Sequence, residues 1–373
     1  MQIAVNTRLL QKKNLDGIGQ FSVEILKRLC VNMAAQQFLF IFDRKEEQDY
    51  IFCPNVQYMR VPPPTRHPLL IKTWFNYAIP LSVRLKKADI FFSPDGFLSP
   101  NLNIPQIPVV HDLNFLHYPQ AFPEVYKKLF LDYFVKNLLK ADHIITVSNF
   151  SKNDIVNSLQ IPAEKITVAY NGRSDAYRPL QEEEKNNVRK RYTQGKPYFI
   201  FIGTLIPRKN IARLLQAFDK FKTTYQTEHK LLIVGNKRWW DTEMEEAFIN
   251  MLHHKSVVFT GYLPQNQMPY ILGAAECLLF VPLFEGFGIP LVDAMAANVP
   301  IISSNTSAMP EVVGKAALLV NPLDIDAIVA AMCEIITEKT QCQHLIQAGN
   351  RQLKLFSWDN SAQIIAKLLQ SYN

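Results

Sequence analysis

The sequence contains few cysteines, few glycines and no long hydrophobic run, and each shortage excludes a class of protein. Its five cysteines are scattered and no two are spaced as CxxC, which argues against a zinc ribbon or a thioredoxin-type site. Its 13 glycines are too few for a collagen-like chain. The longest apolar candidate, Ile271 to Phe284, is interrupted by Glu276 and is too short to span a bilayer. The segment Met1 to Arg8 is too short and polar for a signal peptide, so we expect a reduced, cytoplasmic protein.

Acidic residues are missing from one long stretch of the chain. Between Tyr50 and Ala88 there is no Asp or Glu, whereas six residues are Lys or Arg. Residues 1–180 hold 21 Lys and Arg against 15 Asp and Glu, and the remainder holds 19 against 18. This bias predicts an anionic partner for the first half, either a membrane surface or a phosphorylated acceptor. No recognised nucleic-acid-binding motif accompanies it, so we expect no nucleic-acid partner.

The apolar residues inside this basic stretch allow two interpretations. The segment Leu69 to Leu85 combines Trp74, Phe75 and Tyr77 with the basic side chains. It is either an amphipathic helix that contacts a membrane or a core-packed helix with a solvated basic edge. The first interpretation predicts a peripheral position on the inner face of the cytoplasmic membrane.

The chain has 373 residues, of which 48% are hydrophobic and 20% charged, and is long enough for two or three globular domains. Short apolar segments alternate with helical patterns, which is typical of parallel sheets covered by helices on both faces. The polar segment 181–196, an exposed helix or a linker, separates two such halves. Helices are also predicted at 126–139 and from the N-cap Ser357 to Leu369. The predicted strands are 2–6, 37–42, 90–92, 108–111, 143–147, 198–202, 230–234, 256–259, 277–281, 300–303 and 317–320.

The strongest motif follows the predicted strand 277–281. In open parallel sheets ligands bind beyond the carboxyl ends of the strands, so the residues there carry functional information. Gly286 and Gly288 allow the backbone to approach a ligand closely, and the helix that starts beside them can bind phosphate at its N-terminus. Glu285 precedes this helix and Asp293 is expected in its first turn. The two acids can accept hydrogen bonds from sugar hydroxyls. Alternatively, they lie there only because the helix dipole stabilises acids near a helix N-terminus.

A second motif follows the predicted strand 198–202. Gly203 ends the strand, and Arg208 and Lys209 precede a helix predicted at 211–218. Two adjacent cations at the carboxyl end of a strand can neutralise a diphosphate, although such pairs are also common on ordinary surfaces. The presence of the first motif favours the functional interpretation.

Three further motifs are weaker. Gly17-Ile18-Gly19 follows the first strand but lacks the third glycine of the dinucleotide fingerprint, so we interpret it as a close-approach loop. His111 at a strand end can hydrogen-bond a polar ligand or be structural, and Asp112 either fixes its tautomer or caps the next turn. Asp324-Ile325-Asp326 resembles a DxD metal site, but it opens a helix and we interpret it as a cap.

Taken together, these motifs resemble one family over essentially the whole chain. The residues that carry the resemblance are Glu285-Gly-Phe-Gly-Ile-Pro with Asp293, Gly203-Thr204 with Arg208-Lys209-Asn210, Tyr170-Asn171-Gly172, and Pro310-Glu311-Val312-Val313-Gly314. They are similar to the retaining GT-B glycosyltransferases of family 4, also called group 1. The resemblance implies an α/β fold of two Rossmann-like domains with parallel sheets facing a central cleft. It assigns 1–175 to the acceptor side, 176–355 to the nucleotide sugar, and 356–373 to a helix packing back on the N-terminal domain.

The resemblance also implies roles for individual residues. Arg208 and Lys209 would contact the donor diphosphate. Glu285 would bind sugar hydroxyls, and His111 would reach the donor sugar from the other domain. The family usually has Glu where this chain has Asp293, so the contact with the nucleotide ribose depends there on a shorter side chain. The expected donor-binding residues are Gly17, Gly19, Gly203, Thr204, Tyr262, Leu263, Gly286, Phe287, Gly288, Ile289 and Asp293.

The reaction implied is transfer of a hexosyl group from a nucleoside diphosphate to a hydroxyl with retained configuration. No metal is expected, because cationic side chains and a helix N-terminus can neutralise the leaving diphosphate. The pattern at 201–205 and 259–264 is similar to the mannosyltransferase-like branch that builds bacterial surface polysaccharides. We therefore expect GDP-mannose, or otherwise a UDP-sugar, as donor and a lipid-linked or growing saccharide as acceptor. The alternatives are a non-catalytic nucleotide- or glycan-binding member, and an epimerase or phosphorylase of the same architecture.

Overall fold

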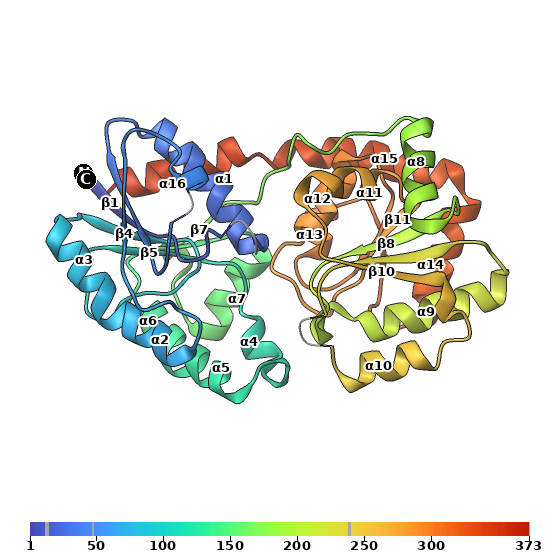
Figure 1. The fold of residues 1–373 in the computed structure, drawn as a ribbon, viewed down its shortest axis with the longest axis horizontal. Helices are drawn as coiled ribbons and strands as arrows, with labels where there is room; N and C mark the ends of the chain where they lie inside the picture. The colour runs from blue at the N-terminus through green and yellow to red at the C-terminus, as the bar shows by residue number, and fades with distance from the viewer. Residues whose placement is uncertain (12–14, 47, 238–239, 373) are drawn as a thin grey trace. The chain divides into compact units, whose positions relative to one another are not determined.

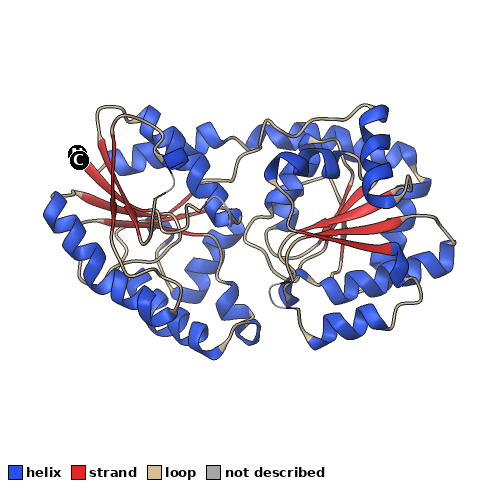
Figure 2. Cartoon of the chain, viewed as in Figure 1, coloured by secondary structure: helices blue, strands red, loops and turns tan. Residues whose placement is uncertain are grey.

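The chain forms two compact α/β units. The computed structural model describes residues 1–11, 15–46, 48–237 and 240–372. The first unit comprises Met1–Gly172 with Ser357–Asn373, and the second comprises Arg173–Phe356. The predicted domain limits lie next to these positions, at 175 and 355. In each unit a parallel sheet lies between layers of helices, as Figure 2 shows. Both units therefore have the helix-covered parallel sheet that the alternating pattern predicts, and the Rossmann-like architecture that the resemblance implies.

The first unit contains a seven-stranded parallel sheet in the order β3-β2-β1-β4-β5-β6-β7. Its strands are β1 (Gln2–Asn6), β2 (Gln37–Phe42), β3 (Val56–Arg60), β4 (Ile90–Ser93), β5 (Gln106–Val110), β6 (Ile144–Thr146) and β7 (Ile166–Val168). The sequence pattern does not predict β3 and β7, which are the two edge strands. In β3 the side chains of Gln57, Tyr58 and Arg60 are exposed, so an edge strand with one partner lacks the apolar run that marks the buried strands.

Helices cover both faces of this sheet (Figure 1). On one face α1 (Gly17–Asn32) packs against α16 (Trp358–Gln370). The helices of the other face share a core cluster with strand residues such as Ala4 and Phe91. They are α2 (Pro68–Thr73), α3 (Ile79–Lys86), α4 (Asn114–His117), α5 (Glu124–Leu129), α6 (Lys136–Leu138) and α7 (Asn149–Leu159).

Two π-helical segments interrupt this second layer. One, Trp74–Ala78, joins α2 to α3, and the other, Phe130–Val135, joins α5 to α6. A single helix is predicted at 126–139 from Leu129, Tyr133 and Leu138. All three are buried, and their spacing of four and then five residues fits a wider π turn better than a regular α-helix.

The second unit contains a six-stranded parallel sheet in the order β10-β9-β8-β11-β12-β13. Its strands are β8 (Tyr198–Ile202), β9 (Lys230–Val234), β10 (Val257–Gly261), β11 (Cys277–Phe280), β12 (Ile301–Ser304) and β13 (Leu318–Val320), and each overlaps a predicted strand. The strand order reverses between β8 and β11. In open α/β sheets such a reversal opens a crevice at the carboxyl ends of the strands.

The helices of the second unit lie on both sides of its sheet (Figure 1). They are α8 (Glu182–Thr193), α9 (Ile211–Tyr225), α10 (Thr242–Ile249), α11 (Met268–Gly273), α12 (Ile289–Ala296), α13 (Met309–Val313), α14 (Ile325–Thr337) and α15 (Lys339–Gln352). The polar segment 181–196 is thus the helix α8, which buries Thr193 and exposes most of its charged residues. Within the described parts of the chain, no helix combines the length and the apolar character needed to cross a bilayer.

The start of α16 is fixed by a cap and by a close contact. Ser357 is its N-cap, as predicted, and its hydroxyl accepts a hydrogen bond of 3.3 Å from the Asn360 N–H. The Trp358 ring meets Phe21 of α1 edge-on at 6.0 Å. A Cβ on Gly172 would lie 2.2 Å from the Trp358 backbone nitrogen, so only glycine fits there.

Candidate functional site

The loops that follow β8 and β11 are tied together at the reversal of strand order. After β8 a short 3₁₀ turn, Pro207–Lys209, precedes α9. The Arg208 carbonyl accepts a hydrogen bond of 2.8 Å from the Leu283 N–H. Asn210 has a left-handed backbone, and its side-chain amide donates to the carbonyls of Val281 (3.0 Å) and Pro322 (2.7 Å). These bonds hold the two loops in a fixed relation before any ligand binds.

Two cations and one carboxylate meet on these loops. Arg208 Nη1 donates to the Phe284 carbonyl at 2.9 Å and to Glu285 Oε1, and Lys209 Nζ lies 2.7 Å from the same Oε1. The Lys209 ammonium also lies 4.7 Å from the centroid of the Phe280 ring. The three charged side chains are only 11–14% exposed. The structure thus brings together three of the four residues expected to be catalytic.

The charges of this cluster favour an anionic ligand. Burial by itself would raise the pKa of Glu285, but Arg208 and Lys209 outweigh that effect and hold this pKa below its usual value. Glu285 is therefore ionised at neutral pH, and the three side chains together carry one net positive charge. A diphosphate can bind such a pair of cations, and a carboxylate beside it can accept hydrogen bonds from sugar hydroxyls.

Glycines keep the backbone around the cluster close. Gly203 has φ +152°, and a Cβ there would lie 3.4 Å from the end of the Lys209 side chain. A Cβ on Gly235 would lie 1.9 Å from the Gly203 carbonyl oxygen, so the loops after β8 and β9 are in direct contact. Thr204, also expected to bind the donor, is half-buried in the same loop.

The loop after Glu285 leads directly into α12. Gly286, Phe287 and Gly288 are buried, and the Phe287 ring packs edge-on against Phe356 at 5.5 Å. Gly288 has φ +90°, a conformation that favours glycine, and Ile289 begins the helix. These four expected donor-binding residues therefore line the helix N-terminus beside the cluster, where backbone N–H groups point out of the helix.

Tyr262 and Leu263 lie further along the same edge of the sheet. They follow β10, and the Gly261 carbonyl at the end of that strand accepts a bond of 3.0 Å from the Gly235 N–H. The Tyr262 side chain is 52% exposed. Among the described residues, no hydrogen bond or ion pair joins these two side chains to the Arg208 cluster. Tyr262 and Leu263 therefore lie at the same edge of the sheet but are not part of the cluster.

Asp293 does not lie where the sequence predicts. It belongs to the second turn of α12, whose first turn contains no acid, so the prediction of a first-turn position is wrong and the helix dipole does not explain this residue. Its side chain is buried, and burial raises its pKa to about 7. The nearby Tyr177 hydroxyl lowers this pKa only partly, and Oδ1 has no hydrogen-bond partner among the described residues. A carboxyl group this poorly compensated is unusual in a structural position.

In the first unit, His111 lies just beyond β5. Its Nε2 lies 2.9 Å from the Pro94 carbonyl, and its ring meets Phe21 edge-on at 5.0 Å. Burial lowers the pKa of His111 and outweighs the carbonyl and nearby carboxylates, so the ring is neutral at pH 7. Nε2 therefore carries the proton and Nδ1 is an acceptor. Asp112 accepts from the Asn114 N–H at 3.1 Å, so it caps the next turn and the Pro94 carbonyl fixes the tautomer.

Gly17 and Gly19 lie in the first turn of α1. Gly17 is exposed, whereas Gly19 is buried and its N–H donates to the Asp16 carboxylate at 2.9 Å. Asp16 is thus the N-cap of this helix. The N–H of Gly19 is engaged within the loop, which leaves Gly17 as the better placed of the two for a ligand.

An ion pair in the first unit was not predicted. Arg8 follows β1 and Asp95 follows β4, and Arg8 Nε donates to Asp95 Oδ2 at 2.5 Å. Asp95 Oδ1 also accepts from the Asn6 side chain at 2.7 Å. Strands β1 and β4 flank the reversal of strand order in this sheet. The signal that could have identified the pair is the position of each residue just after one of these two strands.

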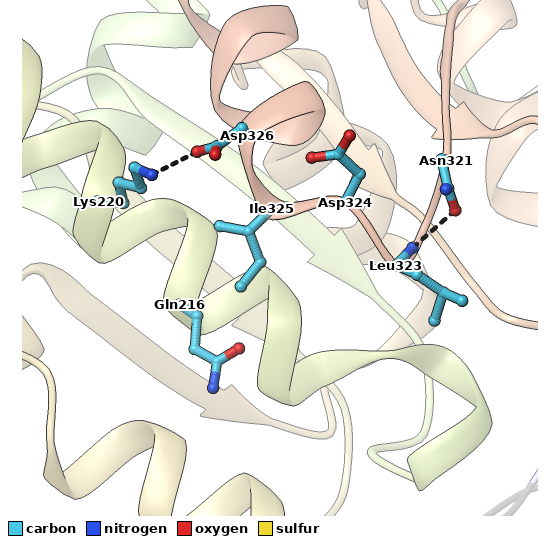
Figure 3. Close-up of a pocket in the computed structure, with 7 residues that line it drawn as sticks. All are labelled: Gln216, Lys220, Asn321, Leu323, Asp324, Ile325 and Asp326. Carbon is cyan, nitrogen blue, oxygen red and sulfur yellow. Dashed lines mark hydrogen bonds and ion pairs between the residues drawn. The ribbon is translucent and has the colours of Figure 1, made fainter.

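The Asp324-Ile325-Asp326 segment has structural roles. Figure 3 shows it in an open pocket between α9 and α14, with Lys220 paired to Asp326 and the Asn321 side chain bonded to the Leu323 N–H. Asp324 is the N-cap of α14 and accepts from the Ala327 N–H at 3.0 Å, which confirms the prediction of a cap. Within the described residues, no group of three or more His, Cys, Asp or Glu is arranged to hold a metal.

Two family models together match most of the chain. Residues 25–177 match Glycosyltransferase Family 4, and residues 182–352 match Glycosyl transferases group 1. The match to the second model contains the Arg208, Lys209 and Glu285 cluster.

Individual relatives agree with these models. The chain is 29% identical over 364 residues to O-antigen chain mannosyltransferase B of Escherichia coli, covering 94% of each chain. It is 29% identical over 263 residues to O-antigen chain mannosyltransferase RfbU of Salmonella typhimurium, covering 70% of this chain and 68% of that protein. The fold is similar to that of HepE from Anabaena, solved with UDP-glucose, with a TM-score of 0.76, 16% identity and full coverage of both chains. The chain therefore belongs to the group 1, family 4 glycosyl transferases of the GT-B fold, and it is a glycosyltransferase that resembles mannosyltransferases.

Proposed function

We propose that the protein transfers mannose from GDP-mannose, with retained anomeric configuration, to a hydroxyl of a lipid-linked or growing surface saccharide of the O-antigen type. The observation that carries the proposal is the buried cluster of Arg208, Lys209 and Glu285 at the reversal of strand order. The names of the two mannosyltransferase relatives support the choice of sugar and acceptor.

In this proposal each residue has a defined task. Arg208 and Lys209 bind the diphosphate and stabilise the negative charge that grows on it as the glycosidic bond breaks. Glu285 exchanges part of its ion pairing for hydrogen bonds from sugar hydroxyls. The N–H groups at Gly286 to Ile289 bind phosphate oxygens, and Gly203 and Thr204 line the same edge. Asp293 accepts hydrogen bonds from the ribose.

On the other unit, His111 accepts a hydrogen bond from a sugar hydroxyl through Nδ1. The acceptor oxygen forms the new glycosidic bond while the bond to the diphosphate breaks, and the leaving phosphate oxygen takes the acceptor proton. No covalent protein nucleophile and no metal enters this proposal, because the two cations supply the charge that the leaving group requires. We also propose that the protein works on the inner face of the cytoplasmic membrane, held there peripherally by its basic first unit.

A thermal-shift series tests the donor. Purified protein is heated with GDP, UDP, ADP and their common sugars, without added metal, and the hits are assayed for sugar transfer. A ligand at a hundred times its dissociation constant stabilises a protein by about 2.7 kcal/mol, which is readily measured. Selective stabilisation by GDP and GDP-mannose is the expected result. Selectivity for UDP and UDP-glucose, the ligand named for HepE, would be consistent with the proposed transferase activity but would replace GDP-mannose with a UDP-sugar as the donor. Absence of a shift with every nucleotide would contradict the proposal.

A further inference from the structure

The helical segment from α2 to α3 has a buried face and an exposed apolar face. Trp74 and Phe75 are fully buried in the core of the first unit, which fixes the orientation of the segment. On the outside, Tyr77, Leu81 and Leu85 follow one another at intervals of four residues, a spacing that places side chains on one helix face. Their exposed fractions are 68%, 59% and 68%. The two interpretations drawn from the sequence therefore both apply, each to one face.

Basic residues gather at the C-terminal end of this face. Arg84, Lys86 and Lys87 are all exposed, and α3 ends at Lys87 with a left-handed backbone. Cations in the last turn of a helix interact favourably with the helix dipole, and this interaction explains some of the basic residues here. It does not account for the absence of every Asp and Glu between Tyr50 and Ala88.

The same composition extends to the start of the segment. Leu69 in α2 is 65% exposed, and it lines a shallow groove between α2 and α5 together with Lys72, Val125, Lys128 and one acid, Glu124 of α5. Single exposed leucines are ordinary, but a helical segment that exposes a row of apolar side chains beside cations and itself contains no acid is not. Leu and Tyr can enter the interfacial zone of a bilayer while Lys and Arg bind its anionic headgroups.

We infer that the α2–α3 surface, formed by Tyr77, Leu81, Leu85, Arg84, Lys86 and Lys87, docks the first unit on an anionic lipid bilayer. The contact is interfacial, since neither α2 nor α3 has the length of a membrane-spanning helix. The inference deepens the proposed peripheral location and rests on it, but it does not depend on which sugar is transferred.

Vesicle flotation tests this surface. The full chain is mixed with vesicles of phosphatidylcholine alone, or of phosphatidylcholine and phosphatidylglycerol in a two-to-one ratio. The charge variant is Arg84→Gln/Lys86→Gln/Lys87→Gln, and its control removes the same charge elsewhere as Lys190→Gln/Arg191→Gln/Lys255→Gln, three exposed positions of the second unit. The apolar variant is Leu81→Ser/Leu85→Ser, matched by Ile249→Ser/Leu252→Ser, which are 65% and 76% exposed.

The parent protein and both controls are expected to float with the phosphatidylglycerol vesicles and not with phosphatidylcholine alone. The charge variant should lose about 100-fold in partition coefficient at low salt, and the parent should be released at high salt. The apolar variant should lose about tenfold.

Equal binding of the parent and both surface variants would overturn the assignment of this surface while leaving the peripheral location in place. No binding of the parent to either vesicle would overturn both. Nucleotide-induced thermal stabilisation of every variant is measured in parallel. It reports folding and donor binding, so a failure of the proposed transferase is recognised separately from a failure at the membrane.

Discussion

The hydroxyl of Tyr177 lies beside the carboxylate of Asp293 and lowers its pKa. Tyr177 precedes α8 and Asp293 lies in α12, so this contact joins the beginning of the second unit to the helix that follows the Glu285 loop. The hydroxyl stabilises the ionised carboxylate only partly, since burial still raises its pKa to about 7. Asp293 is therefore the acid of the site that changes its charge near neutral pH.

The first prediction concerns stability against pH. An unfolded Asp ionises at its ordinary pKa of 3.8, whereas folded Asp293 keeps its proton up to about 7. Between these values the folded state binds more protons, so the free energy of unfolding falls as pH rises, by about 4 kcal/mol in total. Asp293→Asn has no such dependence. Urea unfolding of both proteins should show that the free energy of unfolding of the variant rises relative to that of the parent from about pH 4 to pH 7. Above pH 7 the difference between the two proteins should stay constant. A constant difference would contradict the assigned pKa.

The second prediction concerns nucleotide binding. If ribose hydroxyls donate to Asp293, the ionised form binds better, and the affinity for GDP should rise about tenfold from pH 6 to pH 8. Tyr177→Phe removes the hydroxyl that favours ionisation of Asp293, so it should shift this rise in affinity to higher pH. Isothermal titration calorimetry across the pH range measures both. Asp293→Asn is the control, and it should show a flat profile. A parent profile as flat as that of the variant would exclude Asp293 from the ribose site.

The third prediction concerns the cation pair. If the two cations bind the donor diphosphate, Arg208→Ala and Lys209→Ala should each lower kcat/KM for the donor by about 100- to 1,000-fold, because each removes one cation that stabilises this leaving group. The remaining cation still pairs with Glu285, so the fold should persist. Steady-state transfer kinetics measure the effect, and circular dichroism checks the fold. Lys190→Ala, at an exposed position of α8, is the control and should transfer sugar at the parent rate. Parent-like rates in both site variants would show that the diphosphate is bound elsewhere.

The fourth prediction concerns the docking of α16. Gly172→Ala places a methyl group against the Trp358 backbone nitrogen and should destabilise the first unit by about 1–3 kcal/mol or more. Asp359→Ala breaks the 2.7 Å ion pair with Arg28, in which the Asp359 side chain is 73% exposed, and should cost less than about 1 kcal/mol. Thermal unfolding of the two variants tests the difference. Equal effects would mean that α16 adjusts to the added methyl.

Much of the fold could be predicted from the sequence because buried parallel strands are continuous apolar runs. Each strand of the second unit was identified in this way, from Tyr198–Ile202 to Leu318–Val320. The edge strands β3 and β7 were not predicted, because β3 exposes mixed polar residues and β7 is only three residues long. The edge strands β10 and β13 were predicted, because their apolar residues still form a run. The π turn at Phe130–Val135 was visible only as an irregular spacing.

The residues of the candidate site could be predicted where each directly follows a strand in the sequence. Arg208, Lys209 and Glu285 each follow a strand, and the strand order brings those strands together. Tyr177 could not be predicted, because its role depends on contact with a helix far along the chain. The first-turn position of Asp293 was wrong because α12 begins at Ile289, which places Asp293 in the second turn of the helix.

The two units also repeat one arrangement. Each sheet places its first strand between its second and fourth, and in each an arginine after the first strand meets an acid after the fourth: Arg8 with Asp95, and Arg208 with Glu285. This is the pattern that duplication of a single ancestral half would leave. After such a duplication one copy can diversify while the other is held by selection. Two halves built on one plan each place an arginine and an acid at the reversal of strand order, so a change in one crevice leaves the charge pair of the other in place.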